Sequence, residues 1–195
     1  MAVLERDATS RARLVATVEA AGVEVGVAAT PRPDFVPLIR QTGCDVVFLG
    51  LDAPEANTLE LATAIPCPLV LCSLDTSPAM IGTARQMDAM AFLVRPIRAE
   101  QIAPTIALAV ARFRDRQVLR RALDERKLIE RAKGRLMALH GVTEDDAFRW
   151  LRRRSMDTRM RMADVARQVL GQPASFRAGR STMGHRGHTA VRTPG

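Results

Sequence analysis

The residues best suited to chemistry in this sequence are Lys and Arg side chains, and most of them lie in its second half. Residues 112–170 hold 17 Lys and Arg against 9 Asp and Glu, whereas residues 1–111 hold 8 against 12. Because these side chains bind phosphates, a basic segment attached to an acidic one favours a polyanionic partner such as nucleic acid. The alternative is that arginine only keeps a helical surface soluble. Six basic residues are candidate contacts on grounds of charge and expected exposure: Arg131, Arg135, Arg152, Arg153, Arg159 and Arg161.

The patterns that would indicate an enzyme are missing from the sequence. It has no paired carboxylates, no Ser/His/Asp set, no cluster of metal ligands and no glycine-rich phosphate loop, so we predict neither catalysis nor a cofactor. Cys44, Cys67 and Cys72 lie in apolar stretches and are interpreted as reduced core thiols. No apolar run is long enough to cross a bilayer and no cleavable leader is found, so we expect a cytoplasmic protein without membrane contact.

Three predicted amphipathic helices carry the basic residues. In the first, apolar side chains recur at three- and four-residue steps and share one face: Leu123, Leu128, Ile129, Ala132, Leu136, Met137 and Leu139. After a break at Gly141, Thr143 can cap a second helix, which is expected to bury Ala147, Phe148 and Leu151. A further break is predicted at Asp157–Thr158. The third helix has its own apolar face and ends before Gly171 and Pro173: Met162, Val165, Ala166, Val169 and Leu170.

This helical segment resembles an ANTAR domain over roughly residues 115–170. The resemblance rests on the run Ala132-Lys-Gly-Arg-Leu-Met137, on Ala147-Phe148 with Leu151, and on Asp164-Val-Ala166. One departure is Met156, where the family usually has alanine followed by a second small or apolar residue. The resemblance implies the RNA-binding output module of a transcription antitermination regulator, which recognises paired hairpins in leader transcripts. It also adds Lys133, the lysine of the motif, to the candidate RNA contacts.

The first half of the sequence alternates strand-like and helix-like segments. Strands are expected at Ala2–Leu4, Val23–Ala29, Asp45–Leu51, Cys67–Ser73 and Ala91–Val94, with helices at Ser10–Ala21, Phe35–Gln41, Asn57–Ala64, Ala79–Met90 and Ala99–Phe113. This alternation predicts a parallel sheet covered on both faces. Together with Asp45–Pro54, Ser73 and Arg95-Pro96, it resembles a response-regulator receiver, an α/β flavodoxin-like doubly wound sheet with strand order 2-1-3-4-5.

The resemblance to a receiver does not extend to its phosphorylation chemistry. A receiver phosphorylates an aspartate at the end of its third strand, with Mg²⁺ held by that aspartate and by acids after the first strand. Here the acceptor position is Gly50, the acid pair reads Glu5-Arg6, and Arg95 replaces the lysine after the fifth strand. Only Ser73 matches the expected hydroxyl. We therefore predict a degenerate pseudo-receiver without a phosphorylation site.

Two nearby acids offer alternatives to this prediction. Asp52 could accept the phosphoryl group, but a shift of two residues along a strand moves an acceptor by about 6–7 Å, so we favour a residue that caps a turn before Pro54. Glu5 and Asp7 could bind a cation together, but we favour a solvated acidic patch and predict no metal site.

These features divide the chain into a pseudo-receiver (1–112), a helical connector (113–124), the ANTAR domain (125–171) and a disordered basic tail (172–195). An apolar seam predicts that the last receiver helix continues into the connector and pairs two chains as a coiled-coil homodimer: Ile102, Ile106, Ala109, Val110, Phe113, Leu119, Ala122 and Leu123. The alternative is that this helix packs on its own receiver. In the tail, His185 and His188 lack further metal ligands.

The leading hypothesis is an RNA-binding antiterminator, and two other classes stay open. The helices could form a DNA-binding helix-turn-helix on a receiver, although a short glycine-centred turn between the second and third helices is missing. The pseudo-receiver could instead serve chiefly as a protein-interaction module controlled by a sequestering sensor. For base stacking, Trp150 is a candidate platform and Phe148 is assigned to the core. Regulators that this chain resembles commonly control nitrate and nitrite assimilation.

Overall fold

The computed structural model describes residues 1–32, 35–53 and 56–171. The predicted basic tail, with His185 and His188, and the turn at Pro54 lie outside these residues. The chain divides into two compact units, with the boundary between Val118 and Leu119. Within the described residues, none of the helices combines the length and the apolar character needed to cross a membrane.

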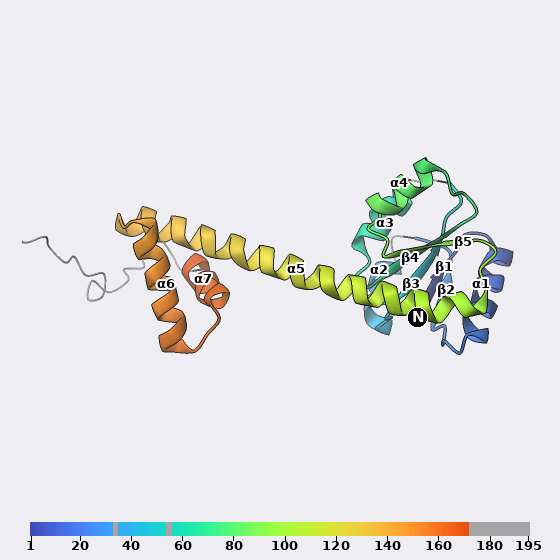
Figure 1. Ribbon diagram of the computed structural model, residues 1–195, viewed down its shortest axis with the longest axis horizontal. Coiled ribbons are helices and arrows are strands. Elements are labelled where there is room, and N and C mark those ends of the chain that lie inside the picture. Colours follow the sequence, from blue (N-terminus) through green and yellow to red (C-terminus); the bar gives the residue numbers. More distant parts are fainter. Residues whose placement is uncertain (33–34, 54–55, 172–195) are drawn as a thin grey trace, which may run out of the picture. The chain divides into compact units, whose positions relative to one another are not determined.

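A parallel five-stranded sheet organises the first unit (Figure 1). Its strands are β1 (Ala2–Leu4), β2 (Val27–Ala29), β3 (Val47–Gly50), β4 (Leu69–Ser73) and β5 (Ala91–Val94). They are ordered β2-β1-β3-β4-β5, which confirms the predicted flavodoxin-like topology. Leu4 pairs with Leu49 and Gly50 with Cys72, so the carboxyl ends of β1, β3 and β4 meet at one edge of the sheet.

Helices cover both faces of this sheet, as the apolar strands predicted. They are α1 (Ala8–Ala20), α2 (Phe35–Thr42), α3 (Ala56–Ala64), α4 (Pro78–Gln86) and the start of α5 (Ala99–His140). Leu14 of α1 and Ile102 of α5 pack with Phe48 on one face. On the other face, α2, α3 and α4 pack against Leu49 and its neighbours. Successive residues of β3 therefore serve opposite cores, because side chains alternate along a strand.

Helix α5 runs without a break over 42 residues and so includes the predicted connector. Ile102 and Ala109 are fully buried, and Phe113 packs against the same core, so the early part of the seam packs on its own sheet. Beyond it the apolar side chains are exposed, Leu119 by 66% and Leu123 by 59%. The prediction that Leu123 belongs to the core of the ANTAR helices is therefore wrong.

The second unit is formed by the last part of α5, by α6 (Glu144–Thr158) and by α7 (Met162–Gly171). Its core is small and rich in alanine: Ala132, Leu136, Ala147, Leu151, Val165, Ala166 and Val169. Such short side chains let three helices approach closely. Within residues 119–171 this core confirms the predicted three-helix arrangement, and Trp150 packs against it from the side.

Three details of the second unit differ from the sequence-based prediction. Phe148 is 40% exposed instead of buried, because the core is centred on Ala147 and Leu151 and the following side chain turns toward the flank of α6. Met137 and Leu139 are also more than a third exposed, at 38% and 37%. Asp157 and Thr158 lie inside α6, which ends at Arg159 in a left-handed conformation with φ 54°.

The three cysteines are free thiols, as predicted. Cys72 is buried in the sheet, whereas Cys44 and Cys67 are half-buried. Burial raises the pKa of Cys67 and of Cys72 to about 12. Both thiols therefore stay protonated and unreactive at neutral pH.

Candidate functional site

Lys133, on α5, lies between two carboxylates where α5 meets the start of α6. Its Nζ is 2.8 Å from Glu130 Oε2 and 2.7 Å from Glu144 Oε1, and the side chain is only 10% exposed. The hydrogen bond to Glu130, followed by that to Glu144, raises the pKa of Lys133, and the bond from Lys133 lowers the pKa of Glu144. The Nζ also stands 6.0 Å from the centroid of the Phe148 ring. The motif lysine thus ties α6 to α5, and a phosphate would have to compete with two carboxylates for it.

The beginning of α6 is capped as the sequence predicted. The Thr143 hydroxyl oxygen accepts from the Asp146 amide at 3.2 Å, and the hydroxyl donates to Asp146 Oδ2 at 2.7 Å. That donated bond lowers the pKa of the Asp146 carboxyl. Glu144, Asp145 and Asp146 fill the first turn, where negative charge complements the helix dipole.

Acidification is expected to destabilise the second unit. The Glu144 carboxylate is favoured in the folded state, so its contribution to stability is complete above its ordinary pKa of 4.5 and is lost as the pH falls through the lower folded value. The variant Glu144→Gln should unfold at a lower temperature at pH 7 and lose less stability on acidification. Trp150, the single tryptophan of the chain, reports unfolding of this unit by fluorescence.

Asp145→Asn is the matched control for that measurement. It removes a carboxylate from the same helical turn but leaves the bond between Lys133 and Glu144. If both variants shift the thermal midpoint equally at pH 7, the effect belongs to the helix dipole and the tie between Lys133 and Glu144 contributes nothing of its own.

The seven candidate basic residues fall into two groups by their contacts. Arg135 donates to the Leu170 carbonyl at 3.1 Å, and Arg161 pairs with Glu125 and Asp164 at 3.4 and 3.2 Å. With Lys133, these side chains hold the three helices together. In contrast, no ion-pair partner is found within residues 1–32, 35–53 and 56–171 for four exposed side chains: Arg131, Arg152, Arg153 and Arg159.

The four unpaired candidates occupy two places on the second unit. Arg152 and Arg153 are adjacent on α6, and Arg159 caps the end of the same helix. Arg131 lies on α5, two residues before Lys133, which corresponds to a turn of about 200° around the helix axis. Arg131 therefore faces away from the junction that Lys133 occupies, and the other three unpaired candidates belong to α6 and its C-cap.

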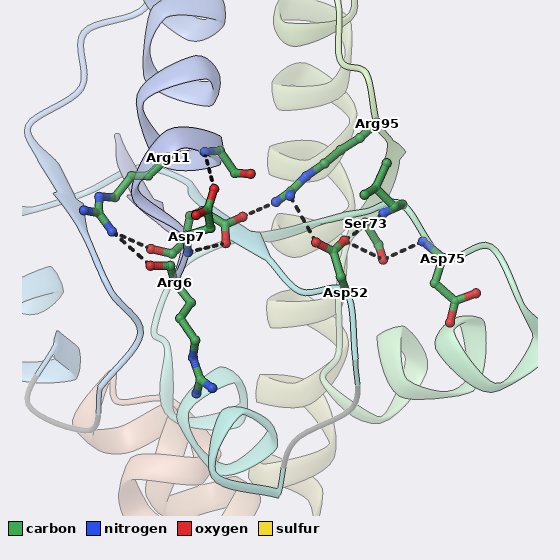
Figure 2. A network of polar contacts seen from close by, with 10 residues as sticks. Arg6, Asp7, Arg11, Asp52, Ser73, Asp75 and Arg95 are labelled. Atoms are coloured by element: carbon green, nitrogen blue, oxygen red, sulfur yellow. Dashed lines mark hydrogen bonds and ion pairs between the residues drawn. The ribbon is translucent and has the colours of Figure 1, made fainter.

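In the first unit, an arginine occupies the edge of the sheet where β1, β3 and β4 end. Figure 2 shows Arg95 reaching from the end of β5 toward this edge. It forms an ion pair with Glu5 and a second with Asp52, whose Oδ2 is 3.3 Å from Arg95 Nη1. The side chains of Arg95 and Glu5 are only 13% and 6% exposed. A positive charge fixed by the protein itself thus stands among the acids of this edge.

Gly50, the last residue of β3, lies directly against this ion pair. A Cβ atom at position 50 would overlap with Glu5 Oε2 and Arg95 Nη2 and would stand 2.6 Å from Glu5 Cδ. A side chain at this position would therefore displace the pair between Glu5 and Arg95.

The neighbouring polar residues at this edge have protein partners as well. Asp52 accepts hydrogen bonds from the Leu74 amide at 2.9 Å and from the Ser73 hydroxyl at 3.5 Å. These bonds connect the loop after β3 to the end of β4. Asp7 caps α1 by accepting from the Ser10 amide at 2.7 Å, which lowers its pKa. The Arg6 side chain points away from Arg95 (Figure 2). In the described part of the chain, no three His, Cys, Asp or Glu residues are grouped to hold a metal ion.

Comparison with known proteins bears on both units. The family model described as "ANTAR domain" matches residues 117–170. Over 185 residues the chain is 33% identical to the "Transcriptional regulatory protein PdtaR" of Mycobacterium tuberculosis, covering 88% of this chain and 90% of that protein. The chain belongs to the family of ANTAR-type antitermination regulators. This is a family of regulators, not of enzymes.

Two further similarities concern the units separately. The ANTAR unit is 46% identical over 59 residues to the "Nitrate regulatory protein" of Klebsiella oxytoca, which covers 30% of this chain and 15% of that protein. The first unit resembles the signal receiver domain of a modulated diguanylate cyclase from Desulfovibrio desulfuricans G20, with a TM-score of 0.50 and 15% identity over 57% of this chain and 92% of that one. The latter similarity shows the receiver-like fold alone.

The residues that suggested the ANTAR resemblance are mostly core residues of the ANTAR unit. Ala132, Leu136, Ala147, Leu151 and Ala166 all belong to its core. The motif residues therefore specify how the three helices pack, and they say less about which side chains are exposed for binding. One motif residue lies outside this core, because Phe148 is exposed, and its periodicity did not predict that exposure.

Proposed function

We propose that this regulator binds hairpins in leader transcripts through the ANTAR unit and thereby prevents a terminator from forming. The observation that carries the proposal is the set of exposed arginines without ion-pair partners among the described residues, Arg152, Arg153 and Arg159 on α6 and Arg131 on α5. Guanidinium groups that are not neutralised by carboxylates are available to phosphates. Lys133, Arg135 and Arg161 contribute chiefly by holding the helices that present this surface.

A titration at two salt concentrations tests the proposal. The full chain is titrated with a pool of paired RNA hairpins and with a DNA duplex of equal charge, at about 50 mM and about 200 mM salt. Specific hairpin binding should persist at the higher concentration, while the DNA complex dissociates. Equal and salt-labile binding to both would mean a generic basic surface, and a preference for duplex DNA would favour a DNA-binding regulator instead.

We further propose that the receiver-like unit is a pseudo-receiver that does not accept a phosphoryl group. Gly50 has no side-chain oxygen to accept the phosphoryl group, and the adjoining space is filled by the ion pair between Arg95 and Glu5. Arg95 also supplies the positive charge that a magnesium ion supplies elsewhere. The chain should therefore gain no mass when it is incubated with Mg²⁺ and a small acyl phosphate.

Restoring an aspartate at position 50 should not restore phosphorylation. In Gly50→Asp the new side chain must displace Glu5 and Arg95, so we expect a loss of roughly 1–3 kcal/mol in unfolding free energy and no phosphorylated product by intact mass. Gly82→Asp, on α4, is the control, because a Cβ there meets no atom within 4 Å. A phosphorylated Gly50→Asp protein of unchanged stability would contradict this account of the site.

Contacts with other proteins are one way to regulate a receiver-like unit that is not phosphorylated. We propose that a sensor protein binds the pseudo-receiver and that two chains associate through the exposed apolar part of α5, where Val118 is 65% and Leu119 66% exposed. Sedimentation equilibrium of the full chain tests the homodimer. A regulator of nascent transcripts acts where transcription takes place, so we propose a cytoplasmic location.

A further inference from the structure

Phe148 is an exposed aromatic side chain on α6, the helix that also carries Arg152 and Arg153. It is 40% exposed, although it stands in an apolar motif and next to the fully buried Ala147. Aromatic residues make up only 4% of the chain, and the one tryptophan packs against the core of the ANTAR unit. Within residues 119–171, Phe148 is thus the aromatic residue that offers a ring to a ligand.

The ring is held in place by the ion pairs at the junction of α5 and α6. Lys133 Nζ lies 6.0 Å from the ring centroid, and this ammonium group is itself fixed between Glu130 and Glu144 at 2.8 and 2.7 Å. A ring beside a fixed cation loses little freedom when a ligand stacks on it.

The residues around Phe148 favour RNA as the ligand. Phe148, Arg152 and Met156 are spaced by four residues and lie along one face of α6, where Met156 is 69% exposed. Arg152 is exposed and has no ion-pair partner among the described residues. An aromatic ring can stack on an unstacked base, and an unpaired guanidinium next to it can bind the phosphate of that nucleotide. The apolar side chain extends the surface available to the base.

We propose that Phe148 is the base-stacking residue of this ANTAR unit and that it receives an unpaired loop base of the RNA hairpin, with Arg152 on the adjoining phosphate. This inference rests on the proposed function. It adds a residue that distinguishes loop nucleotides from paired ones, because a side chain can stack only on a base that has left the RNA duplex. The arginines supply affinity for any phosphate backbone, whereas Phe148 selects hairpins with an accessible loop base.

The test uses the full chain and RNA hairpins with one common stem and a randomised loop. The hairpin that binds the wild-type protein most tightly is then titrated against Phe148→Ala, Phe148→Leu and Phe148→Tyr. Phe148→Ala and Phe148→Leu should weaken binding about 5- to 150-fold, with an unchanged dependence on salt, because the lost contact involves no counterions. Phe148→Tyr keeps the ring and should bind as the wild type does. Arg152→Ala should differ from all three, because it should reduce by about 1 the slope of the logarithm of the binding constant against the logarithm of the salt concentration (the salt slope).

Leu139→Ala is the matched control, since Leu139 is 37% exposed and belongs to the same unit. It should bind with unchanged affinity, and Trp150 fluorescence should show that all variants are folded. Wild-type affinity in folded Phe148→Ala or Phe148→Leu would overturn the assignment of Phe148 while leaving the RNA-binding proposal intact. If no hairpin from the pool binds the wild-type protein more tightly than duplex DNA does, the proposed function itself fails.

Discussion

Arg95→Met should lower the unfolding free energy of the receiver-like unit by about 3–5 kcal/mol at neutral pH. The substitution keeps most of the apolar stem but leaves Glu5, whose side chain is 6% exposed, as a buried charge without its cation. Such a charge loses its hydration and keeps only the hydrogen bond that Glu5 Oε1 accepts from the Asp7 amide at 3.1 Å. Urea unfolding gives the total loss, and hydrogen exchange of the peptides containing β1 and β3 locates it in the first unit.

Two further variants make this prediction specific. Arg98→Met removes a charge three residues along the chain, but Arg98 is 70% exposed and its partner Glu100 69% exposed, so the loss should stay within about 1 kcal/mol. Adding Glu5→Gln to Arg95→Met should recover part of the stability, because the buried group is then neutral. Equal losses in Arg95→Met and Arg98→Met would show that the buried ion pair does not stabilise the fold.

The double variant Arg152→Ala/Arg153→Ala should weaken binding to hairpin RNA roughly 10- to 100-fold near physiological salt and reduce the salt slope by about 2. Both side chains are exposed on α6 and lack ion-pair partners among the described residues, so their charges are available to phosphates. The affinity is measured by fluorescence anisotropy at several salt concentrations. The folded state should be unaffected, because neither side chain contributes to the core of the ANTAR unit.

The control removes the same amount of charge from neutralised positions. Arg149 pairs with Asp146 and Arg167 with Asp164, so Arg149→Ala/Arg167→Ala also lowers the net charge by two. It should change the affinity far less, since these guanidinium groups already have carboxylate partners. If both double variants weaken binding equally, net charge alone governs the interaction and the distinction between paired and unpaired arginines has no functional meaning.

Much of the fold followed from local patterns. The alternation of apolar strands with amphipathic helices predicted the parallel sheet, because each such segment must bury its apolar residues on a sheet face, and the resemblance to a receiver implied the strand order. The predicted strands were longer than those observed, as in Val23–Ala29 against Val27–Ala29, since apolar residues that flank a strand need not join its ladder. The cap at Thr143 was found because it depends only on residues three positions apart.

The candidate sites depended on contacts that no local pattern contains. Charge alone could not show that Arg135 and Arg161 already have partners in the fold. Arg135 donates to the Leu170 carbonyl, 35 positions away, and Arg161 to Glu125, 36 positions away. No such partner is found for Arg152 and Arg153 among the described residues. The exposure of Phe148 escaped prediction for a similar reason. Its spacing fits an apolar face, but the alanines of the core bring the helices so close that the larger ring is left at the flank.

By itself, the sequence determined the family, the order of the elements and the absence of an acceptor side chain at Gly50, since each of these is a matter of residue type and spacing along the chain. Only the tertiary structure decided that Arg95 fills the place beside Gly50, that Lys133 is held between two carboxylates, and which arginines remain unpaired. The physical reason is that ion pairs and exposure depend on distances between distant segments. Glu5 and Arg95 are 90 residues apart in the chain, and the parallel sheet alone brings them together.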